Sequence, residues 1–532
     1  MKRSFLLLFL VITAFAEAQD RYFVSFKDKA NSTFTVSNPA AFLSSKSIAR
    51  RTRLGISITE EDLPVNATYV AQVKATGAKT FYTSKWWNGV LIQADATTAT
   101  TIAALPFVSK IERVANGTKL LNGRKASKTN VENESATSQV TDFQLTQLGI
   151  DRMQSDNYLG QNINIAQFDS GWKGVNLTTP FAHLINSGRI KETKNFVRNT
   201  TDVYTDDTHG TAVLSVMAGL VSGSFTGGIY MANFYLYETE DKLEEYRVEE
   251  YNWTFAAERA DSIGVDVVNS SLGYNQFDDS SMDYTKANLD GKTSVISNAA
   301  RKLISKGIVV VSAAGNEGSN AWQTIMMPAD TDGIIAVGSI TNNSFKSSFS
   351  SIGPAADGRI KPDVVAFGSG TSTINSTGNL NTTNGTSVAS PLITSLVAGL
   401  VQAFPKASPQ QIYQAIIYSA SQYEKPDNQL GYGIPNYNRA KSYLTYGKLT
   451  KEISIYPNPV KSLLLVLFKE PTGQPVTISL SDYFGRRLIN YTGTTDWSAN
   501  PLQVDVSSLP NGMYILEVTS GGITEVMKVM KI

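Results

Sequence analysis

The sequence predicts an α/β protein in three parts: a small α+β domain, a central domain with a doubly wound parallel sheet, and a C-terminal β-sandwich. Three observations support this prediction. Short, wholly apolar segments alternate with helical segments between residues 140 and 445, as in parallel strands covered by helices on both faces. Residues 20–115 fit the order βαββαβ, and residues 452–532 contain short strands separated by turn residues.

The composition excludes several classes of function. The chain has 532 residues with 47 Lys and Arg against 46 Asp and Glu, so its charge does not favour a nucleic-acid partner. Cysteine is absent, which excludes disulfide scaffolds, zinc–thiolate sites, iron–sulfur clusters and cysteine nucleophiles. Any histidine-dependent chemistry must use His183 or His209, the two histidines of the chain.

Residues 1–18 have the pattern of a secretory signal peptide. Basic residues precede an apolar run at 5–16, and the small residues Ala16 and Ala18 suit cleavage after residue 18. An N-terminal membrane anchor is the alternative, but the run is short for a bilayer span. No later apolar stretch reaches that length, so we expect the mature protein to have no transmembrane segment and to be exported.

The expected N-terminal domain comprises residues 20–115. Its pattern predicts a ferredoxin-like α+β fold, with strands at 22–26, 79–82, 89–93 and 108–114 and helices near 69–73 and 97–105. Residues 116–139 are polar and include four basic side chains. Such a segment indicates an exposed linker that proteases can reach.

The expected central domain comprises residues 140–445. Five apolar strands are predicted, at 163–168, 265–269, 308–312, 334–337 and 363–366. In a parallel sheet, catalytic groups gather at the carboxyl ends of the strands. The third domain, 452–532, is predicted to contain strands at 463–468, 476–480, 487–491, 502–506, 514–518 and 525–531.

Four polar residues occupy positions suited to catalysis in the central domain. Asp169 follows the first predicted strand, and Asn316 follows the third. His209 and Ser387 each stand at the start of an apolar helical stretch. A serine hydroxyl attacks a carbonyl when a neutral imidazole takes its proton, a carboxylate orients the imidazole, and an amide faces the developing oxyanion. These four residues supply those groups.

The surrounding motifs resemble those of the subtilisin-like serine proteases, the subtilases. Asp169-Ser170-Gly171, His209-Gly210-Thr211, Ala314-Gly315-Asn316 and Gly385-Thr386-Ser387 occur in the family's order. The resemblance implies a subtilisin-like fold and a secreted serine endopeptidase that needs no cofactor for its chemistry. It further implies catalytic roles for Asp169, His209 and Ser387, an oxyanion hole with Asn316, and substrate binding by Ser271, Leu272, Gly273, Ala314 and Gly315. The sequence departs from the family at Met326, where small residues often form the floor of the primary specificity pocket.

The flanking parts resemble known modules too. Ser84-Lys85-Trp86-Trp87-Asn88 resembles the propeptide of exported bacterial subtilases, which implies a zymogen with an intramolecular inhibitor. Tyr456-Pro457-Asn458-Pro459 and Leu509-Pro510-Asn511-Gly512 resemble the C-terminal sorting domain of the type IX secretion system. That resemblance implies export across both membranes, to the medium or the cell surface, and a partnership with the secretion machinery. A generic adhesion β-sandwich is the alternative.

Two further alternatives concern function. The chain could be a non-catalytic binding or adhesion protein on a subtilase scaffold, although all four catalytic positions are present. Asp278, Asp279 and Asp283 could bind calcium, but a solvated loop fits that cluster better. His183 lies outside any catalytic motif, so we expect it to be structural.

Overall fold

The computed structural model describes residues 19–117, 141–469, 473–495 and 501–532. The predicted signal peptide and nearly all of the predicted linker therefore lie outside the described residues. Tertiary contacts divide the chain into two units, Met1–Ala440 and Lys441–Ile532. Each unit is described by itself.

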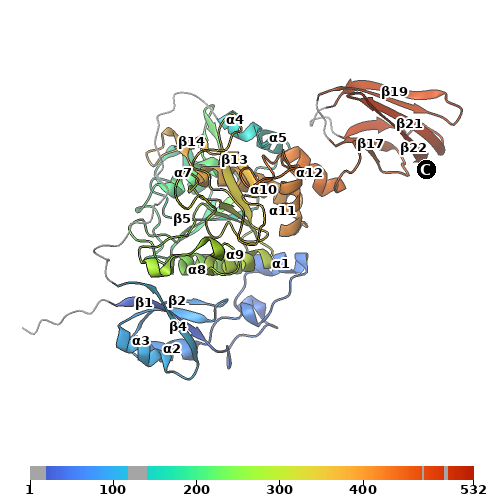
Figure 1. Cartoon of the computed structure of the whole chain (residues 1–532). Coiled ribbons are helices and arrows are strands. Elements are labelled where there is room, and N and C mark those ends of the chain that lie inside the picture. The colour runs from blue at the N-terminus through green and yellow to red at the C-terminus, as the bar shows by residue number, and fades with distance from the viewer. Residues whose placement is uncertain (1–18, 118–140, 470–472, 496–500) are drawn as a thin grey trace, which may run out of the picture. The chain divides into compact units, whose positions relative to one another are not determined.

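The six elements expected in residues 20–115 are present (Figure 1). Strands β1 (Asp20–Phe26), β2 (Lys79–Ser84), β3 (Gly89–Ala94) and β4 (Val108–Ala115) form an antiparallel sheet in the order β2-β3-β1-β4. Helices α2 (Ala67–Ala75) and α3 (Ala96–Ala103) cover one face of the sheet, where their apolar side chains join its core. A further helix, α1 (Ser45–Leu54), was not predicted because it has few apolar residues.

The central sheet has seven parallel strands in the order β13-β12-β11-β10-β5-β9-β6. The five predicted strands correspond to β5 (Asn164–Asp169), β10 (Val267–Ser270), β11 (Val309–Ala313), β12 (Ile335–Ile340) and β13 (Val364–Phe367). Strands β6 (Ile190–Asn195) and β9 (Asn233–Glu238) were missed, since neither is a continuous apolar run. Every residue of β5 and β10 is buried, which agrees with a sheet covered on both faces.

Helices cover the central sheet. Helices α8 (Val248–Ile263) and α9 (Val295–Ser305) pack together between the sheet and the N-terminal domain (Figure 1). Helices α7 (His209–Ala218) and α10 (Thr386–Ala403) pack against each other and against other parts of the sheet. The remaining helices of this unit are α4 (Thr141–Thr146), α5 (Ile150–Ser155), α6 (Ala182–Asn186) and α11 (Pro409–Ser419), and α12 (Tyr437–Tyr446) crosses the boundary between the units.

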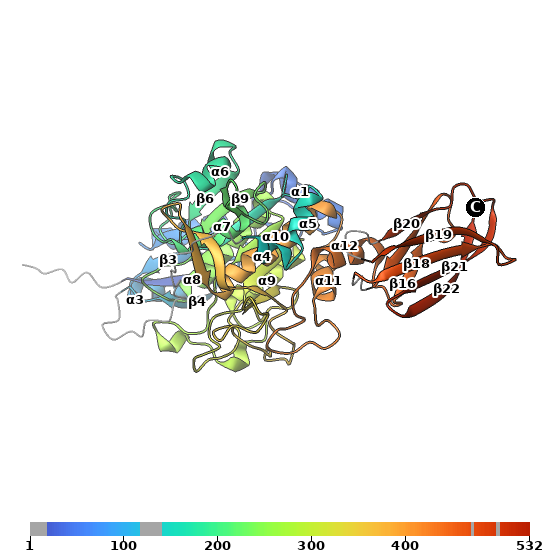
Figure 2. The ribbon, with the colours of Figure 1, turned by 90° about the horizontal axis from the view of Figure 1, so that it is seen from above.

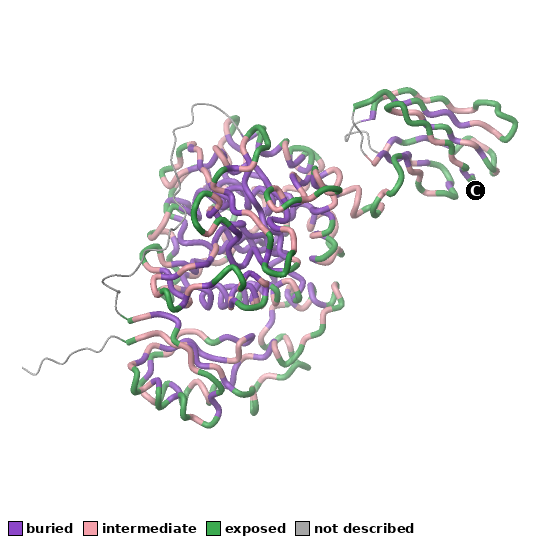
Figure 3. Tube along the Cα trace, viewed as in Figure 1, coloured by how far each residue is buried: buried purple, intermediate pink, exposed green. Residues whose placement is uncertain are grey.

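Helix α10 is the most apolar long helix among the described residues. By length and composition it could cross a membrane, but 83% of it is buried inside the protein. Figure 3 shows the concentration of buried residues in this part of the fold. We therefore interpret α10 as the core helix of the central domain.

Two short hairpins complete the central domain. Strands β7 (Leu220–Val221) and β8 (Phe225–Thr226) form the first, and β14 (Ser369–Ile374) and β15 (Leu380–Asn384) form the second. Strand β15 leads directly into α10, so the second hairpin determines where that helix begins.

The C-terminal unit has two antiparallel sheets (Figure 2). Strands β16 (Ile453–Tyr456), β17 (Leu463–Phe468) and β20 (Leu502–Asp505) form one sheet. Strands β18 (Pro475–Ser481), β19 (Arg487–Thr494), β21 (Gly512–Ser520) and β22 (Ile523–Lys531) form the other. Side chains from both sheets share one hydrophobic core, as in a β-sandwich. All six predicted strands are present, and β16 is an additional one.

A buried ion network joins the N-terminal domain to α8. Asp261 of α8 is fully buried and accepts hydrogen bonds from Arg50 and Arg51 of α1 at 2.7 and 2.8 Å, and from Lys85 at 3.0 Å. Arg50 also donates to the carbonyl oxygens of Asp261 and Val265, so it satisfies carbonyls at the end of α8. The neighbouring Glu258 accepts hydrogen bonds from the backbone N–H groups of Lys85 and Trp86.

Replacing Asp261 should strongly destabilise this arrangement. Asp261→Ala leaves three buried cations without a shared carboxylate, and losing one partner of a buried pair costs about 3–5 kcal/mol. Arg259→Ala is a matched control on the same helix, because the exposed Arg259–Glu192 pair should contribute less than about 1 kcal/mol. Urea unfolding of the full chain compares the two variants, and equal losses would contradict the importance of the network.

Candidate active site

Asp169 and His209 form a buried pair at the carboxyl edge of the sheet. Asp169 ends β5 and His209 begins α7, as predicted, and Oδ1 of Asp169 lies 2.6 Å from Nδ1 of His209. Asp169 is fully buried, and 8% of His209 is exposed. Forty positions separate these residues in the sequence, and the fold brings the end of β5 against the start of α7.

Two glycines permit this close approach. A Cβ atom at Gly171, where φ is +145°, would lie 2.6 Å from the backbone nitrogen of Asp207. A Cβ atom at Gly210 would lie 2.5 Å from the carbonyl oxygen of Gly171. The glycines of the two motifs are therefore required by packing, because the chain after Asp169 lies directly against the chain around His209.

The carboxylate of Asp169 is held in place by other donors. The Ser170 backbone N–H donates to Oδ1 at 2.9 Å, and the Gln167 side chain donates to Oδ2 at 3.1 Å. Gln167 also donates to the carbonyl oxygen of Gly210 at 3.0 Å, so it links β5 to α7. The sequence analysis did not identify Gln167, although a polar residue in an otherwise apolar strand was a usable signal.

The pair alters the titration of His209. Burial by itself lowers the pKa of the imidazole, but the adjacent Asp169 carboxylate outweighs burial and raises the pKa to about 9. Among the described residues, buried Nε2 of His209 has no hydrogen-bond partner. The imidazole is thus oriented through Nδ1, while its other nitrogen is left to exchange a proton.

Ser387 lies in the first turn of α10. It is 2% exposed, and its carbonyl oxygen accepts a hydrogen bond from Oγ of Ser271 at 2.8 Å. Farther along the helix, Ser390 and Thr394 donate to Oδ1 of Asn269. These hydrogen bonds join α10 to the end of β10 and position Ser387 at the edge of the sheet.

Asn316 faces the space beside Ser387. Its Oδ1 accepts hydrogen bonds from the backbone N–H and the hydroxyl of Thr386, both at 2.9 Å, which orients its amide. A Cβ atom built on Gly385 would lie 2.7 Å from Oγ of Ser387 and 3.6 Å from Nδ2 of Asn316. The hydroxyl and the amide N–H group therefore border one small space.

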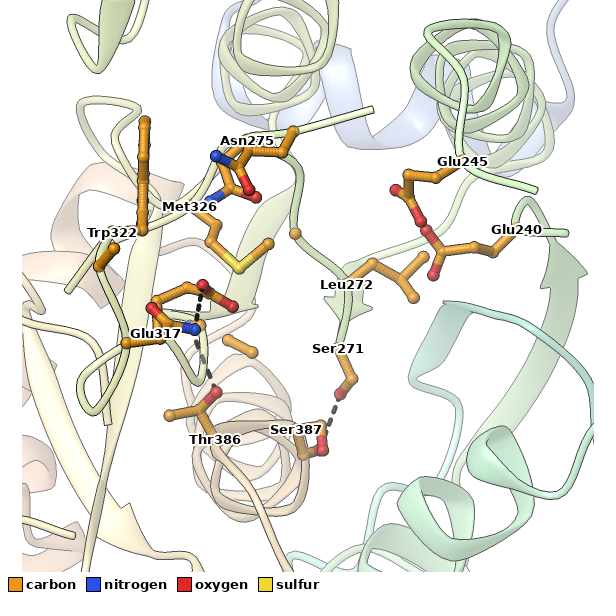
Figure 4. Close-up of a pocket in the computed structure, with 16 residues that line it drawn as sticks. Glu240, Glu245, Ser271, Leu272, Asn275, Glu317, Trp322, Met326, Thr386 and Ser387 are labelled. Atoms are coloured by element: carbon orange, nitrogen blue, oxygen red, sulfur yellow. Dashed lines mark hydrogen bonds between the residues drawn. The ribbon is translucent and has the colours of Figure 1, made fainter. Parts of the chain in front are cut away.

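A pocket of about 220 Å³ adjoins Ser387 (Figure 4). Ser271, Leu272, Gly273 and Gly315, for which the resemblance implies substrate binding, line it. Ala314 is fully buried and does not line the pocket, whereas Ala313 does. Substrate binding by these residues stays a prediction. Met326 lines the pocket, and the lining residues that the sequence analysis did not name include Glu317, Trp322, Glu240 and Glu245.

Carboxylates gather at one end of this pocket. One oxygen from each of Glu240, Glu245 and Glu249 lies within 4.8 Å of the others, and all three residues are buried. Oxygen donors of this kind suit a hard cation such as Ca²⁺. The proposed calcium ligands do not form such a group, because Asp278 and Asp283 accept backbone hydrogen bonds and Asp279 pairs with Arg113. The loop interpretation of those three aspartates therefore fits their contacts.

The titration of the two histidines tests the geometry of the pair. His183 lies in α6 outside the pocket, and burial lowers its pKa. We therefore expect one imidazole NMR signal to titrate below pH 6.5 and the other, from His209, to titrate well above it. Asp169→Asn should lower the pKa of His209 relative to the wild type, since only Asp207 and Glu240 then oppose the effect of burial, and His183→Gln assigns the signals. An unchanged His209 pKa in Asp169→Asn would contradict the pairing.

Comparisons with known proteins agree with the fold and the motifs. The model of the subtilase family matches residues 160–433. The model of the peptidase S8 propeptide domain of Bacteroidota matches residues 21–136, and that of the secretion system C-terminal sorting domain matches residues 454–532.

Similar proteins include subtilisin-like protease SBT6.1 of Arabidopsis thaliana, 28% identical over 327 residues, and subtilisin NAT of Bacillus subtilis subsp. natto, 28% identical over 279 residues. The matches cover 58% and 52% of this chain, and 28% and 65% of those proteins. The crystal structure of the epidermin leader peptide processing serine protease of Staphylococcus aureus superposes with a TM-score of 0.55 at 16% identity, covering 81% of this chain and all of that one. This chain therefore belongs to the subtilase family, with a propeptide domain before its peptidase domain and a secretion sorting domain after it.

Proposed function

We propose that this chain is an exported serine endopeptidase in which Asp169, His209 and Ser387 form the catalytic triad. The observation that carries this proposal is the buried Asp169–His209 pair at the same sheet edge as Ser387, whose hydroxyl shares a small space with the Asn316 amide. The adjoining pocket can receive a side chain of a peptide substrate.

In the proposed reaction, Oγ of Ser387 attacks the carbonyl carbon of a peptide bond while Nε2 of His209 takes the hydroxyl proton. Asn316 donates through Nδ2 to the oxyanion of the tetrahedral intermediate. Asp169 stabilises the imidazolium, the same interaction that raises the pKa of His209. The imidazolium then protonates the leaving amine, the C–N bond breaks, and water hydrolyses the acyl-enzyme by the same route. No step needs a metal or cofactor, and a calcium ion would serve structure alone.

The second candidate is a non-catalytic binding protein on a subtilase scaffold. The hydrogen-bonded Asp169–His209 pair disfavours it, since a binding surface has no need of an oriented imidazole. A fluorophosphonate probe distinguishes the two functions. Labelling of the wild type but not of Ser387→Ala requires an activated nucleophile.

Ser387 and His209 should behave as one catalytic unit. Each alanine substitution should lower kcat by roughly 10⁵ to 10⁶, and the double variant should be hardly worse, because either loss abolishes the same step; these magnitudes are those of subtilisin, a relative. Turnover of a peptide p-nitroanilide by the folded variants measures this. Additive losses would contradict the assigned pair.

The N-terminal domain is proposed to act as an intramolecular inhibitor that is removed on maturation. Its docking through α1 and Lys85–Trp86 onto α8 supports this role. The predicted cleavage site lies between about residues 116 and 142, most of which lie outside the described residues. N-terminal sequencing of the secreted form locates the cut.

The C-terminal unit is proposed to serve export through the type IX secretion machinery. Removing residues 452–532 should leave the peptidase folded, because this unit is separate and the residues of the proposed site all precede it. The truncated chain should remain inside the cell, as cell fractionation can show. Full-length Ser387→Ala is the matched control and should be exported. Normal export of the truncated chain would instead favour an adhesion role for the sandwich.

A further inference from the structure

Gln167 is a polar residue in the middle of a buried strand. It is fully buried in β5, two residues before Asp169. Because the side chains of a strand alternate between its two faces, Gln167 and Asp169 lie on the same face of the sheet. Helix α7, which begins with His209, packs against β5. The amide of Gln167 therefore lies where the strand that carries the carboxylate meets the helix that carries the imidazole.

The amide of Gln167 donates to both of these elements. Its nitrogen donates to Oδ2 of Asp169 at 3.1 Å and to the carbonyl oxygen of Gly210, in the first turn of α7, at 3.0 Å. A side-chain amide has two N–H groups, so one can serve each acceptor. The orientation of the amide follows from these neighbours, because the reverse orientation would place its oxygen against two other oxygens.

This arrangement leaves the other end of the amide unsatisfied. Among the described residues, Oε1 of Gln167 is buried and has no hydrogen-bond partner. A buried acceptor without a partner destabilises a fold, and an apolar side chain of similar size would avoid that loss. Gln167 thus interrupts the apolar pattern of β5 where its two donors reach the proposed site. Such exceptions are expected at functional positions.

The two oxygens of the Asp169 carboxylate have different partners. Oδ1 lies 2.6 Å from Nδ1 of His209 and accepts the Ser170 N–H, whereas Oδ2 accepts the amide of Gln167. Donors on both oxygens fix the rotation of the carboxylate. The hydrogen bond to Gly210 holds the first turn of α7 against the same strand. One amide therefore constrains both members of the Asp169–His209 pair.

Asn269 of β10 is paired with Gln167 in the sheet. Its Oδ1 accepts hydrogen bonds from Ser390 and Thr394 of α10, the helix that carries Ser387. Two amides at the same level of adjacent strands are thus each bonded to one helix. Gln167 is bonded to the helix of the proposed base, and Asn269 to the helix of the proposed nucleophile.

We propose that Gln167 is a positioning residue, which keeps the Asp169 carboxylate and the first turn of α7 aligned so that Nε2 of His209 faces the Ser387 hydroxyl. This inference rests on the proposed function and goes beyond it, because it assigns a role to a residue outside the triad and the oxyanion hole. Gln167 does not line the pocket, so it acts through the pair. Misalignment of a proton acceptor lowers kcat and leaves substrate binding unchanged.

Gln167→Met tests the proposal, because methionine has a similar volume and neither donor. On the mature secreted enzyme, kcat for a peptide p-nitroanilide should fall by about 10- to 100-fold, while KM stays within about twofold of wild type. The NMR resonance of the proton between Nδ1 of His209 and Oδ1 of Asp169 should move upfield, since that hydrogen bond lengthens. Variants that do not mature themselves are cut in the linker with trypsin, which is then inhibited.

Asn164→Leu is the matched control. Asn164 is another buried amide of β5, 5% exposed, and it donates to the carbonyl oxygen of Gly264 at the opposite end of the strand. The variant should lower the temperature of unfolding, but kcat and the proton resonance should remain those of wild type. Equal effects of Asn164→Leu and Gln167→Met would reduce Gln167 to a stabilising residue and overturn the proposal.

Gln167→Glu keeps the test decisive if Gln167→Met does not fold. A carboxyl group has at most one donor, so at least one acceptor loses its hydrogen bond, and kcat and the resonance should change in the same directions. A wild type that labels with a fluorophosphonate, beside a variant in which either measure is unchanged, would overturn the role of Gln167 alone. A wild type that does not label would overturn the proposed function and this inference together.

Discussion

The contact between the chain after Asp169 and the chain around His209 is the constraint on which the site depends. The carbonyl oxygen of Gly171 and the Cα atom of Gly210 are too close for any side chain. That approach brings the carboxylate within 2.6 Å of the imidazole, and the short distance outweighs the effect of burial on the imidazole pKa. Backbone packing at two glycines therefore contributes to the raised pKa of a buried histidine.

Buried charge also organises the rest of the first unit. Asp261 forms ion pairs with three cationic side chains of the N-terminal domain. Glu258 accepts backbone hydrogen bonds from the turn that contains Lys85 and Trp86. Such carboxylates are costly to desolvate unless they are paired. Without the covering domain these carboxylates of α8 would lose their partners, so the pairing stabilises the docked arrangement.

The fold was largely predictable where the hydrophobic pattern of a segment matches the burial of that segment in the structure. The five predicted central strands are largely apolar because both their faces are buried. Strand β6 is polar because it lies at the edge of the sheet, and β9 begins with Asn233 and ends with Glu238, so neither is a continuous apolar run. The hairpin β14–β15 is rich in Ser, Thr and Asn, residues typical of turns. These residues form paired strands here because the surrounding fold buries several of their side chains.

The sequence by itself determined the residue types of the proposed site and their places at strand ends and helix starts, because these follow from local periodicity and from motifs a few residues long. Only the tertiary structure decided which groups meet. Gln167 reaches both Asp169 and Gly210, Met326 lies against Gly273 and Gly315, and the carboxylates of three glutamates converge beside the pocket. These features depend on distances between segments far apart in the chain. The pKa of a buried group and the shape of a pocket depend on those distances, so neither can be predicted from a local sequence pattern.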